Sequence, residues 1–396
     1  MPSPWQWTGP LCSATVADVQ GEIDHNERLC RLRLARSRGV GPLTYRQLLQ
    51  RFGSAEAAIG AIVDGEVRAK GRTIGLLPAD IAAQERAAIK KSDGQLITFG
   101  EAAYPEPLAA IADPPPILTL RGDRGLITKP MIAIVGARNA SAAGRSFARS
   151  LARDLGDEGY VVVSGLARGM DGAAHEGALE TGTVAVLAGG ADNVYPPEHT
   201  RLYADIVRQG AVLSEQPLGM VARARDFPKR NRIVSGLSLG VVVVEAAERS
   251  GTLITARLAS EQGRDVFAVP GSPMDPRCAG TNQLLRRGAI LLRDAQDVVT
   301  ELANTRSSLF EPEGLDWHID DEATDEAPQG LKEQLLNLLS YTPIHRDALI
   351  AEAKAPAAVV AMALLDLVLE GRITEENGGG YTLAEPSSET AEVFGT

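Results

Sequence analysis

Hydrophobic residues between positions 131 and 269 come in short runs, separated by segments in which they recur at helical spacing. The runs are MIAIV, YVVV, TVAVLA, AVLS, GVVVV and DVFAV, and the helical segments include SFARSLARDLGDEG, HTRLYADIVRQG and TARLASEQGR. Strand-length apolar runs that alternate with helices are typical of a parallel sheet covered on both faces. The pattern therefore predicts an α/β domain in the middle of the chain.

A helical module and a connector are predicted before this domain. Residues 28–90 are mostly helical in pattern, and the segment RGVGPLTYRQLLQRF places a GVGP turn before a helix. The turn resembles that of a helix-hairpin-helix or SAM-like module, where it either holds a DNA phosphate on backbone N–H groups or simply joins two packed helices. The Pro-rich residues 104–123 are predicted to be a rigid connector laid over the next domain.

The C-terminal segment LKEQLLNLLSYTPIHRDALIAEAKAPAAVVAMALLDLVLEGRITEENGGGYTL predicts three helices and a β-wing around NGGG, and it resembles a winged-helix domain. The whole chain then divides into six regions. They are a flexible N-terminus (1–27), the helical module (28–95), the α/β domain (96–304), an acidic linker (305–328), the winged helix (329–385) and a tail (386–396).

Acidic residues are concentrated near the C-terminus. The chain has 40 Lys and Arg against 51 Asp and Glu, a formal net charge of −11. Residues 310–327 hold eight acids and no Lys or Arg, and residues 329–396 hold ten acids and four bases, so the rest of the chain carries +3. Because steering of a ligand depends on the local field, the α/β domain is compatible with an anionic ligand. The winged helix is predicted to have a protein-contact or regulatory role. The acidic linker is predicted to be disordered, and it is expected to compete with DNA for the cationic site of the α/β domain.

The composition indicates a reducing compartment. Cys12, Cys30 and Cys278 are odd in number and far apart, which argues against a disulfide framework. No apolar run reaches the ~18 residues of a membrane helix, and the N-terminus lacks a signal-peptide pattern. We expect a cytoplasmic protein without membrane contact, cofactor or metal, since its His and Cys residues show no metal-ligand spacing.

Small polar residues follow the predicted strands. The turns read GARNASAAGR, SGLARGMDGAAH, GGADNVYP and AAERSGTLITA. Gly, Ser and Thr at helix starts let backbone N–H groups approach an anion, and the carboxyl ends of parallel strands share one edge of the sheet. These turns therefore predict a phosphate-binding site. Its candidate residues are Gly136, Arg138, Asn139, Ser141, Ser164, Gly165, Arg168, Ser250, Gly251 and Thr252.

Cations cluster before the strand GVVVV. Residues 223–232, RARDFPKRNR, hold five cations and one acid, among them Lys229, Arg230 and Arg232. A cluster that spans two or three phosphates suits a nucleic-acid strand better than one nucleotide. The alternative interpretation is a solvated face, or ion pairs with Asp226 and Glu245. Phe227 offers a plane for base stacking, yet aromatic residues make up only 4% of the chain, so phosphate contacts with weak sequence preference are expected to dominate.

Other kinds of chemistry find little support. The first turn is not G-x-G-x-x-G, and Ser164 stands where a dinucleotide site has its ribose-binding acid; no Walker A motif occurs. His175, after Asp171, is either a general base or part of a helix start. Glu245, at a strand end, is expected to orient Arg230 or Arg232.

The ordered motifs closely resemble the DNA-processing protein A family. They are VVVSGLARGMDGAAHEGALETGTVAVLAGGADNVYPPEH, LSEQPLG, FPKRNRIVSGLS, VVVVEAAERSGTLITARLASEQGRDVFAVPGS and GTNQLLRRGA, and the match covers residues 100 to 300. The resemblance implies an extended Rossmann fold and a non-catalytic dimer. Such a dimer binds incoming single-stranded DNA during natural transformation, protects it and loads the RecA recombinase.

The resemblance also implies roles for single residues. Arg138 matches a DNA-pocket arginine, Ser164 and Gly165 match the SGLA turn, and Arg168 takes a basic position. Lys229, Arg230, Asn231 and Arg232 match the FPxRNR block. Some relatives carry lysine where this chain has Pro197, so one phosphate contact is expected to be absent. The segment GTNQLLRRGAILL resembles the surface for the dimer and RecA, with candidate residues Asn282, Leu284, Leu285, Ile290 and Leu292.

A nucleotide-cleaving enzyme is the alternative hypothesis. Rossmann-like nucleoside monophosphate phosphoribohydrolases of the "lonely guy" type carry a PGGxGTxxE turn. Here the nearest counterpart is ERSGTLITA, which lacks PGG and has Thr255 in place of the glutamate. The enzyme hypothesis therefore lacks its catalytic acid.

Overall fold

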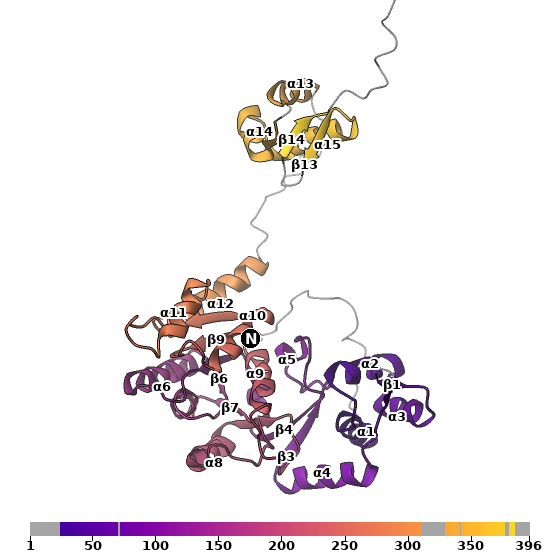
Figure 1. Cartoon of the computed structure of the whole chain (residues 1–396), viewed down its shortest axis with the longest axis vertical. Coiled ribbons are helices and arrows are strands. Elements are labelled where there is room, and N and C mark those ends of the chain that lie inside the picture. Colours follow the sequence, from indigo (N-terminus) through magenta and orange to yellow (C-terminus); the bar gives the residue numbers. More distant parts are fainter. Residues whose placement is uncertain (1–23, 70–71, 311–328, 341, 377–379, 385–396) are drawn as a thin grey trace, which may run out of the picture. The chain divides into compact units, whose positions relative to one another are not determined.

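The computed structural model describes residues 24–69, 72–310, 329–340, 342–376 and 380–384, which belong to two compact units, residues 1–310 and 311–396 (Figure 1). Each unit is considered by itself. No helix among the described residues is both long and apolar enough to cross a membrane.

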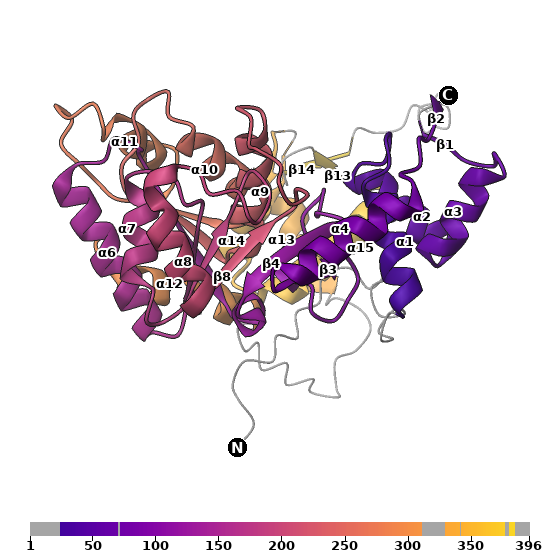
Figure 2. The same cartoon turned by 90° about the horizontal axis from the view of Figure 1, so that it is seen from below.

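The first unit begins with the predicted helical module. Asp24 accepts a hydrogen bond from the Glu27 amide at 3.0 Å and so caps the first helix. Gly41 and Pro42 start the second helix, as the GVGP turn predicts. Its elements are α1 (His25–Ala35), α2 (Pro42–Phe52), α3 (Ala55–Val63), the hairpin β1 (Arg68–Ala69) and β2 (Arg72–Thr73), and α4 (Ala79–Lys91). Figure 2 shows α1, α2 and α3 together at one end of the first unit.

A nine-stranded sheet forms the centre of the unit, in the order β11-β10-β9-β5-β6-β7-β8-β4-β3. All pairs from β11 to β8 are parallel, whereas β4 is antiparallel to both of its neighbours. The strands are β3 (Gly94–Thr98), β4 (Ile117–Gly122), β5 (Met131–Val135), β6 (Val161–Ser164), β7 (Thr183–Val186), β8 (Ala211–Ser214), β9 (Gly240–Val243), β10 (Asp265–Ala268) and β11 (Ile290–Leu291).

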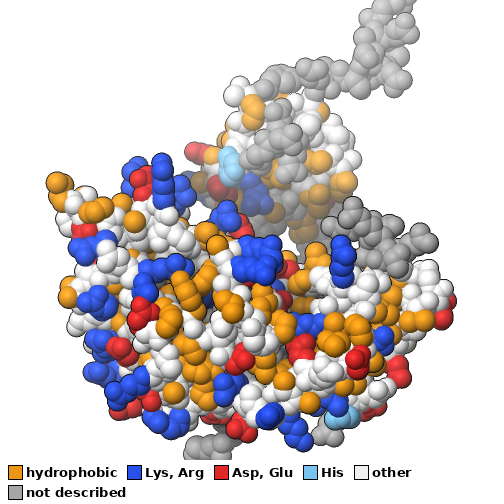
Figure 3. All heavy atoms as spheres, turned by 60° about the horizontal axis from the view of Figure 1, so that its bottom comes forward, with side chains coloured by type: hydrophobic (Ala, Val, Ile, Leu, Met, Phe, Trp, Pro, Cys, Tyr) orange, Lys and Arg blue, Asp and Glu red, His pale blue; other side chains and the backbone are white. Residues whose placement is uncertain are grey.

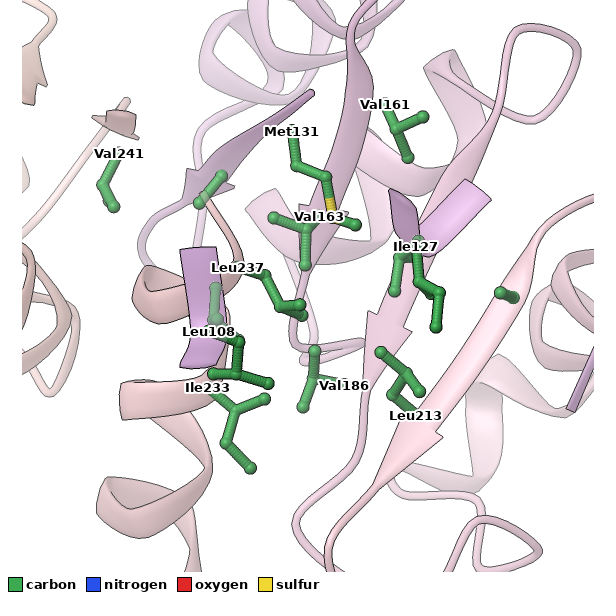
Figure 4. Packing of buried hydrophobic residues seen from close by; sticks show 14 of the residues in the cluster. Leu108, Ile127, Met131, Val161, Val163, Val186, Leu213, Ile233, Leu237 and Val241 are labelled. Atoms are coloured by element: carbon green, nitrogen blue, oxygen red, sulfur yellow. The ribbon is translucent and has the colours of Figure 1, made fainter. Parts of the chain in front are cut away.

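Helices cover both faces of this sheet, which confirms the predicted α/β class. Residues alternate between two cores along β5: Ala133 belongs to one cluster, and its neighbours Ile132 and Ile134 belong to the other. Figure 4 shows part of the first cluster, where Ile233 and Leu237 of α9 (Asp226–Leu237) pack with strand residues. The helices are α5 (Glu106–Ala109), η1 (Arg124–Thr128), α6 (Ala142–Asp157), α7 (Met170–Gly177), η2 (Pro197–His199), α8 (Thr200–Gln209), α9 (Asp226–Leu237), α10 (Thr252–Glu261), α11 (Ala279–Arg286) and α12 (Ala295–Phe310).

The prediction for residues 104–123 was partly wrong. Instead of a connector throughout, this stretch contains α5 and the sheet strand β4. Pro114, Pro115 and Pro116 obscured the strand, because proline lacks the N–H group that a ladder needs. The prolines end just before Ile117, so the ladder itself is intact.

The second unit is a small domain with the predicted three helices and β-wing. Its elements are α13 (Gln329–Leu338), β12 (Ile344–His345), α14 (Arg346–Ala353), α15 (Ala357–Leu369), β13 (Ile373–Glu376) and β14 (Gly380–Leu383), with the sheet order β12-β14-β13. Leu335, Leu349 and Leu364, one from each helix, are buried in its core. Residues 1–23, 311–328 and 385–396 lie outside the described residues, and with them most of the predicted N-terminal segment and linker and the whole tail. Two predicted boundaries were wrong, because α1 already begins at His25 and α12 continues to Phe310, inside the predicted linker.

Candidate nucleic-acid interface

The strand order places one candidate site at a topological switch point. After β5 the chain builds β6, β7 and β8 on one side, and then β9 and β10 on the other side of β5. Ligands of open parallel sheets bind in the crevice at such a point, outside the carboxyl ends of the strands. A cavity of about 890 Å³ lies here, lined by residues that follow β5, β6, β7, β9 and β10 and by the start of α9.

The cavity brings together ten of the fifteen DNA-binding residues predicted from the sequence. They are Gly136, Arg138, Asn139, Gly165, Phe227, Arg230, Asn231, Ser250, Gly251 and Thr252. Among all charged side chains that line it, four are arginines, Arg138, Arg230, Arg249 and Arg277, and one is acidic, Asp171. The cavity is therefore strongly cationic within a chain whose net charge is negative. The face in Figure 3 likewise carries several groups of Lys and Arg side chains on the first unit.

Arg138 is an exposed cation of the cavity, and a contact with an aromatic ring defines its orientation. Its side chain is exposed, and its guanidinium carbon lies 5.3 Å from the centre of the Phe227 ring. Tyr195 meets the same ring edge-on, with the ring centres 5.6 Å apart. Within the described residues no carboxylate pairs with Arg138. The charge is thus held in place by an aromatic face and remains available for an anion.

Arg230 lies deeper and is buried. Its Nη1 atom donates to the Val186 carbonyl oxygen at 3.0 Å, and its Nε atom is buried without a partner. Burial lowers the pKa of Arg230, the nearby Asp171 opposes this shift, and Arg138 adds to it. A buried, incompletely bonded guanidinium at the wall of a cavity is a strong potential donor to a phosphate oxygen.

Asp171 shapes the turn beside Arg230. Its Oδ2 atom accepts hydrogen bonds from the amides of Gly165 and Ala167, both at 3.2 Å. Burial raises the pKa of Asp171, while Arg230 and these two hydrogen bonds lower it. The carboxylate therefore both holds the SGLA turn and partly balances the charge of Arg230. This is the helix-start role that the sequence left open for the Asp171 and His175 pair.

His175 takes no part in the cavity. It is fully buried in α7, and its Nδ1 atom lies 2.7 Å from the Thr183 hydroxyl oxygen. The Thr183 hydroxyl donates to the Val162 carbonyl, so Nδ1 carries the proton in the bond between the two side chains. Burial lowers the pKa of His175 to about 3. The general-base interpretation is wrong, because the ring has no access to the cavity.

Glu245 has a different partner from the one expected. Its Oε2 atom accepts the amide hydrogen of Ser141 at 3.0 Å, and Oε1 accepts the Ser141 hydroxyl hydrogen. The carboxylate thus stabilises the start of α6, where a negative charge is favourable. The expectation that Glu245 orients Arg230 or Arg232 is wrong.

Five predicted residues do not line the cavity. Ser141 is bonded to Glu245, and Ser164 is fully buried, with its hydroxyl donating to the Ile134 carbonyl at 2.6 Å. Arg168 pairs with Glu198. Lys229 is exposed and lies 3.8 Å from Asp226, the ion pair that the alternative interpretation named. Arg232 is buried in an ion-pair cluster described below.

Sequence reasoning missed several lining residues. Tyr195, Arg249 and Arg277 all lie in segments that follow strands, as do the candidate residues of the four quoted turns. Tyr195 and Arg249 stand in two of the turns quoted above, GGADNVYP and AAERSGTLITA. The rule that ligands bind at the carboxyl ends of parallel strands, here called the strand-end rule, would have found both residues if it had been applied to every side chain in these turns. No three His, Cys, Asp or Glu residues in the described part of the chain are grouped to hold a metal ion.

The predicted dimer and RecA surface needs one correction. Leu284, Leu285 and Ile290 are partly exposed, but Leu292 is fully buried in a core cluster with Val298. Successive residues of an extended segment point to opposite sides: Leu291, the last residue of β11, is 48% exposed, whereas Leu292 directly after the strand is buried. Asn282 is partly exposed, and its amide exchanges two hydrogen bonds with the backbone of Gly271.

Fold and site together define a Rossmann-type protein with a cationic strand-end cavity, preceded by a helical module and followed by a winged helix. The protein-family model described as DNA recombination-mediator protein A matches residues 95–303, more than half of the chain. Models for the DprA-like N-terminal HHH domain and the DprA winged helix domain match residues 25–88 and 320–379. The chain belongs to the DNA recombination-mediator protein A family, which confirms the resemblance seen in its motifs.

Individual relatives agree with this assignment. Protein Smf of Escherichia coli (strain K12) is 37% identical over 295 residues, 74% of this chain and 78% of the relative. DNA processing protein DprA of Bacillus subtilis (strain 168) is 41% identical over 229 residues, 57% of this chain and 77% of the relative. The X-ray structure of DNA processing protein A from Streptococcus pneumoniae aligns with a TM-score of 0.57 and 32% identity, over 71% of this chain and 99% of that one.

Proposed function

We propose that this protein binds single-stranded DNA in the cationic cavity and acts as a non-catalytic mediator of recombination. The observation that carries the proposal is Arg138, an exposed guanidinium held on Phe227 at the mouth of a cavity with four arginines and one acid. Membership of a family of DNA-processing proteins agrees with a nucleic-acid ligand.

Two features of the cavity favour a single strand over a duplex. Its lining is concave and combines cations with the aromatic rings of Tyr195 and Phe227. Bases of a single strand can reach aromatic rings, whereas the bases of a duplex are stacked on one another. We expect contacts to the phosphates of the DNA to dominate binding, so the preference for particular base sequences should be weak.

Binding of labelled oligonucleotides of about 20 nucleotides, single-stranded and duplex, tests this function directly. We expect the single strand to bind more tightly than the duplex, and Arg138→Ala to weaken binding. Arg153→Ala, which removes an exposed cation of α6 outside the cavity, is the matched control. Equal binding of both DNA forms, or no effect of Arg138→Ala, would contradict the proposal.

The remaining steps of the function are proposed from the family resemblance. The protein is expected to act in the cytoplasm as a homodimer that protects incoming DNA and loads RecA during natural transformation. The partly exposed residues Leu284, Leu285 and Ile290 are the proposed contact surface. Leu285→Arg is expected to shift the protein from dimer to monomer in light scattering and to slow RecA-dependent ATP hydrolysis on single-stranded DNA. A variant that remains a dimer and still accelerates RecA would contradict this surface.

A nucleotide-cleaving activity is the weaker candidate. The one carboxylate proposed for it, Glu245, is already bonded to the amide and hydroxyl of Ser141. A catalytic carboxylate must reach the reacting atoms of the substrate, and both oxygens of Glu245 are occupied. We therefore propose that the protein has no hydrolase function.

A further inference from the structure

Arg232 belongs to the cationic segment, but its guanidinium pairs with two carboxylates of the protein, the mostly buried Glu215 and the half-exposed Asp113. Its Nη2 atom lies 2.7 Å from both carboxylate oxygens of Glu215. Its Nη1 atom donates to the Asp113 carbonyl oxygen at 2.8 Å, and Nε lies 3.3 Å from Asp113 Oδ2. The side chain is only 10% exposed. One guanidinium thus faces two carboxylates, which leaves no net positive charge for a phosphate.

The same helix carries the cavity residues. Phe227, Arg230 and Asn231 of α9 line the cavity, and Arg232 follows directly in the next position. The Arg232 carbonyl accepts a hydrogen bond from Gln262 Nε2 at 3.1 Å. Arg232 therefore holds α9 by both its side chain and its backbone, at a position between the cavity residues Asn231 and Val234. A shift of α9 would move Phe227 and Arg230 together.

Glu215 extends this cluster to the helical module. Its carbonyl oxygen, just after β8, accepts a hydrogen bond from Arg36 Nη1 at 2.8 Å. Arg36 ends α1, and its other nitrogens hold the Glu85 carboxylate of α4 at 2.9 to 3.2 Å. A continuous set of polar contacts therefore runs from the helical module through Glu215 and Arg232 to α9. All of these side chains are at least four-fifths buried.

We propose that Arg232 and Glu215 are positioning residues that set the DNA-binding geometry of α9, and that Arg36 links this pair to the helical module. The inference rests on the proposed function, because it concerns the same cavity. It assigns Arg232 a role other than the phosphate contact predicted from the sequence. Removing one partner of a buried pair leaves the other charge uncompensated, so α9 is expected to shift when either residue is changed.

The test measures single-strand binding across a salt series for the wild type, Arg232→Gln, Glu215→Gln and the double variant. Thermal melting shows whether each variant is folded, and titration with DNA gives the fraction of each protein that is able to bind. Affinities are then compared for the folded fraction alone. We expect each single variant to weaken binding about 3- to 30-fold, with the double variant no weaker than the worse single one. The log-log salt slope is expected to stay at the wild-type value, because no phosphate contact is lost. Arg36→Ala is expected to act in the same direction, and Arg51→Ala, an exposed cation of α2, to have no effect.

Two results would overturn the inference while leaving the proposed function intact. In the first, Arg232→Gln reduces the salt slope by about 0.7 and Glu215→Gln binds like the wild type, which would make Arg232 a phosphate contact. In the second, neither variant changes the affinity of the folded protein, which would leave the pair with a role in stability alone. Absence of binding by the wild type would instead overturn the proposed function, and the inference with it.

Discussion

The guanidinium group of Arg230 lies directly against the backbone of Gly165. A Cβ atom added at Gly165 would lie 1.5 Å from Nη1 of Arg230 and 2.3 Å from its Cζ atom. Since Arg230 is buried and bonded to the Val186 carbonyl, a side chain at Gly165 would force its guanidinium out of this position. The glycine of the SGLA turn is therefore a requirement for the position of the deepest cation in the cavity.

Gly165→Ala is expected to weaken single-strand binding by at least about tenfold, because overpacking of this size costs about 1–3 kcal/mol and displaces Arg230. Fluorescence anisotropy measures the affinity and thermal melting the stability. Gly60→Ala is the matched control: no atom lies within 4 Å of a Cβ there, and the residue is in the middle of α3. This control should bind like the wild type and melt no lower. Normal binding by Gly165→Ala would show that Arg230 is not needed.

The strand-end rule predicted the cavity well, because it depends on topology alone. Arg138, Gly165 and Thr252 lie far apart in the sequence, yet each follows a strand, and parallel strands end at the same edge. Burial was the part that the sequence could not provide. Ser164 and Arg232 have the same residue types as true lining residues, but local spacing does not reveal which side of a turn or helix faces the core.

The hydrogen-bond and ion-pair partners of individual charged side chains were equally difficult to predict. Glu245 was expected to pair with an arginine of α9 and instead caps α6, 104 positions earlier in the sequence. Arg232 pairs with Asp113, 119 positions away. Such pairs depend on three-dimensional packing, so a sequence can indicate that a buried charge needs a partner without identifying it.

Glu245→Gln tests the enzyme alternative together with the capping role. Loss of the negative charge at the start of α6 is expected to lower the free energy of unfolding by about 1–2 kcal/mol, measured by chemical denaturation. Single-strand binding should change little, because Glu245 does not line the cavity. Release of free base from nucleoside monophosphates by the wild type, lost in Glu245→Gln, would instead revive the hydrolase hypothesis.

His175 is expected to make the protein less stable below neutral pH. Its folded pKa of about 3 lies below the ordinary value of 6.5, so the unfolded chain binds the proton more readily. The free energy of unfolding therefore falls as the pH drops from 6.5 toward 3. Between pH 7.5 and 5.5 this contribution is about 1.4 kcal/mol.

Urea denaturation at these two pH values, for the wild type and His175→Gln, isolates the contribution. The glutamine variant keeps a polar group beside the Thr183 hydroxyl but does not titrate in this range. We expect its loss of stability between pH 7.5 and 5.5 to be smaller than that of the wild type by about 1.4 kcal/mol. Equal losses in the two proteins would mean that His175 is not the group responsible.

The winged helix is expected to contribute little to DNA affinity. Residues 329–396 carry ten acids and four bases, so contact with phosphates is electrostatically unfavourable. A chain that ends at Phe310, where the first compact unit ends, should bind single-stranded DNA within about threefold of the full chain once the dimer fraction is matched. A much larger loss would assign a DNA contact to the C-terminal unit.

The most direct test of the proposed DNA-binding cavity is the salt dependence of single-strand binding by the wild type, Arg138→Ala and the control Arg153→Ala. The wild type should show a log-log slope of roughly −2 to −4, and Arg138→Ala should bind more weakly with a slope smaller in magnitude by about 0.7, the value for one phosphate contact. Arg153→Ala should match the wild type. If Arg138→Ala keeps both the affinity and the slope of the wild type, the DNA does not bind in this cavity.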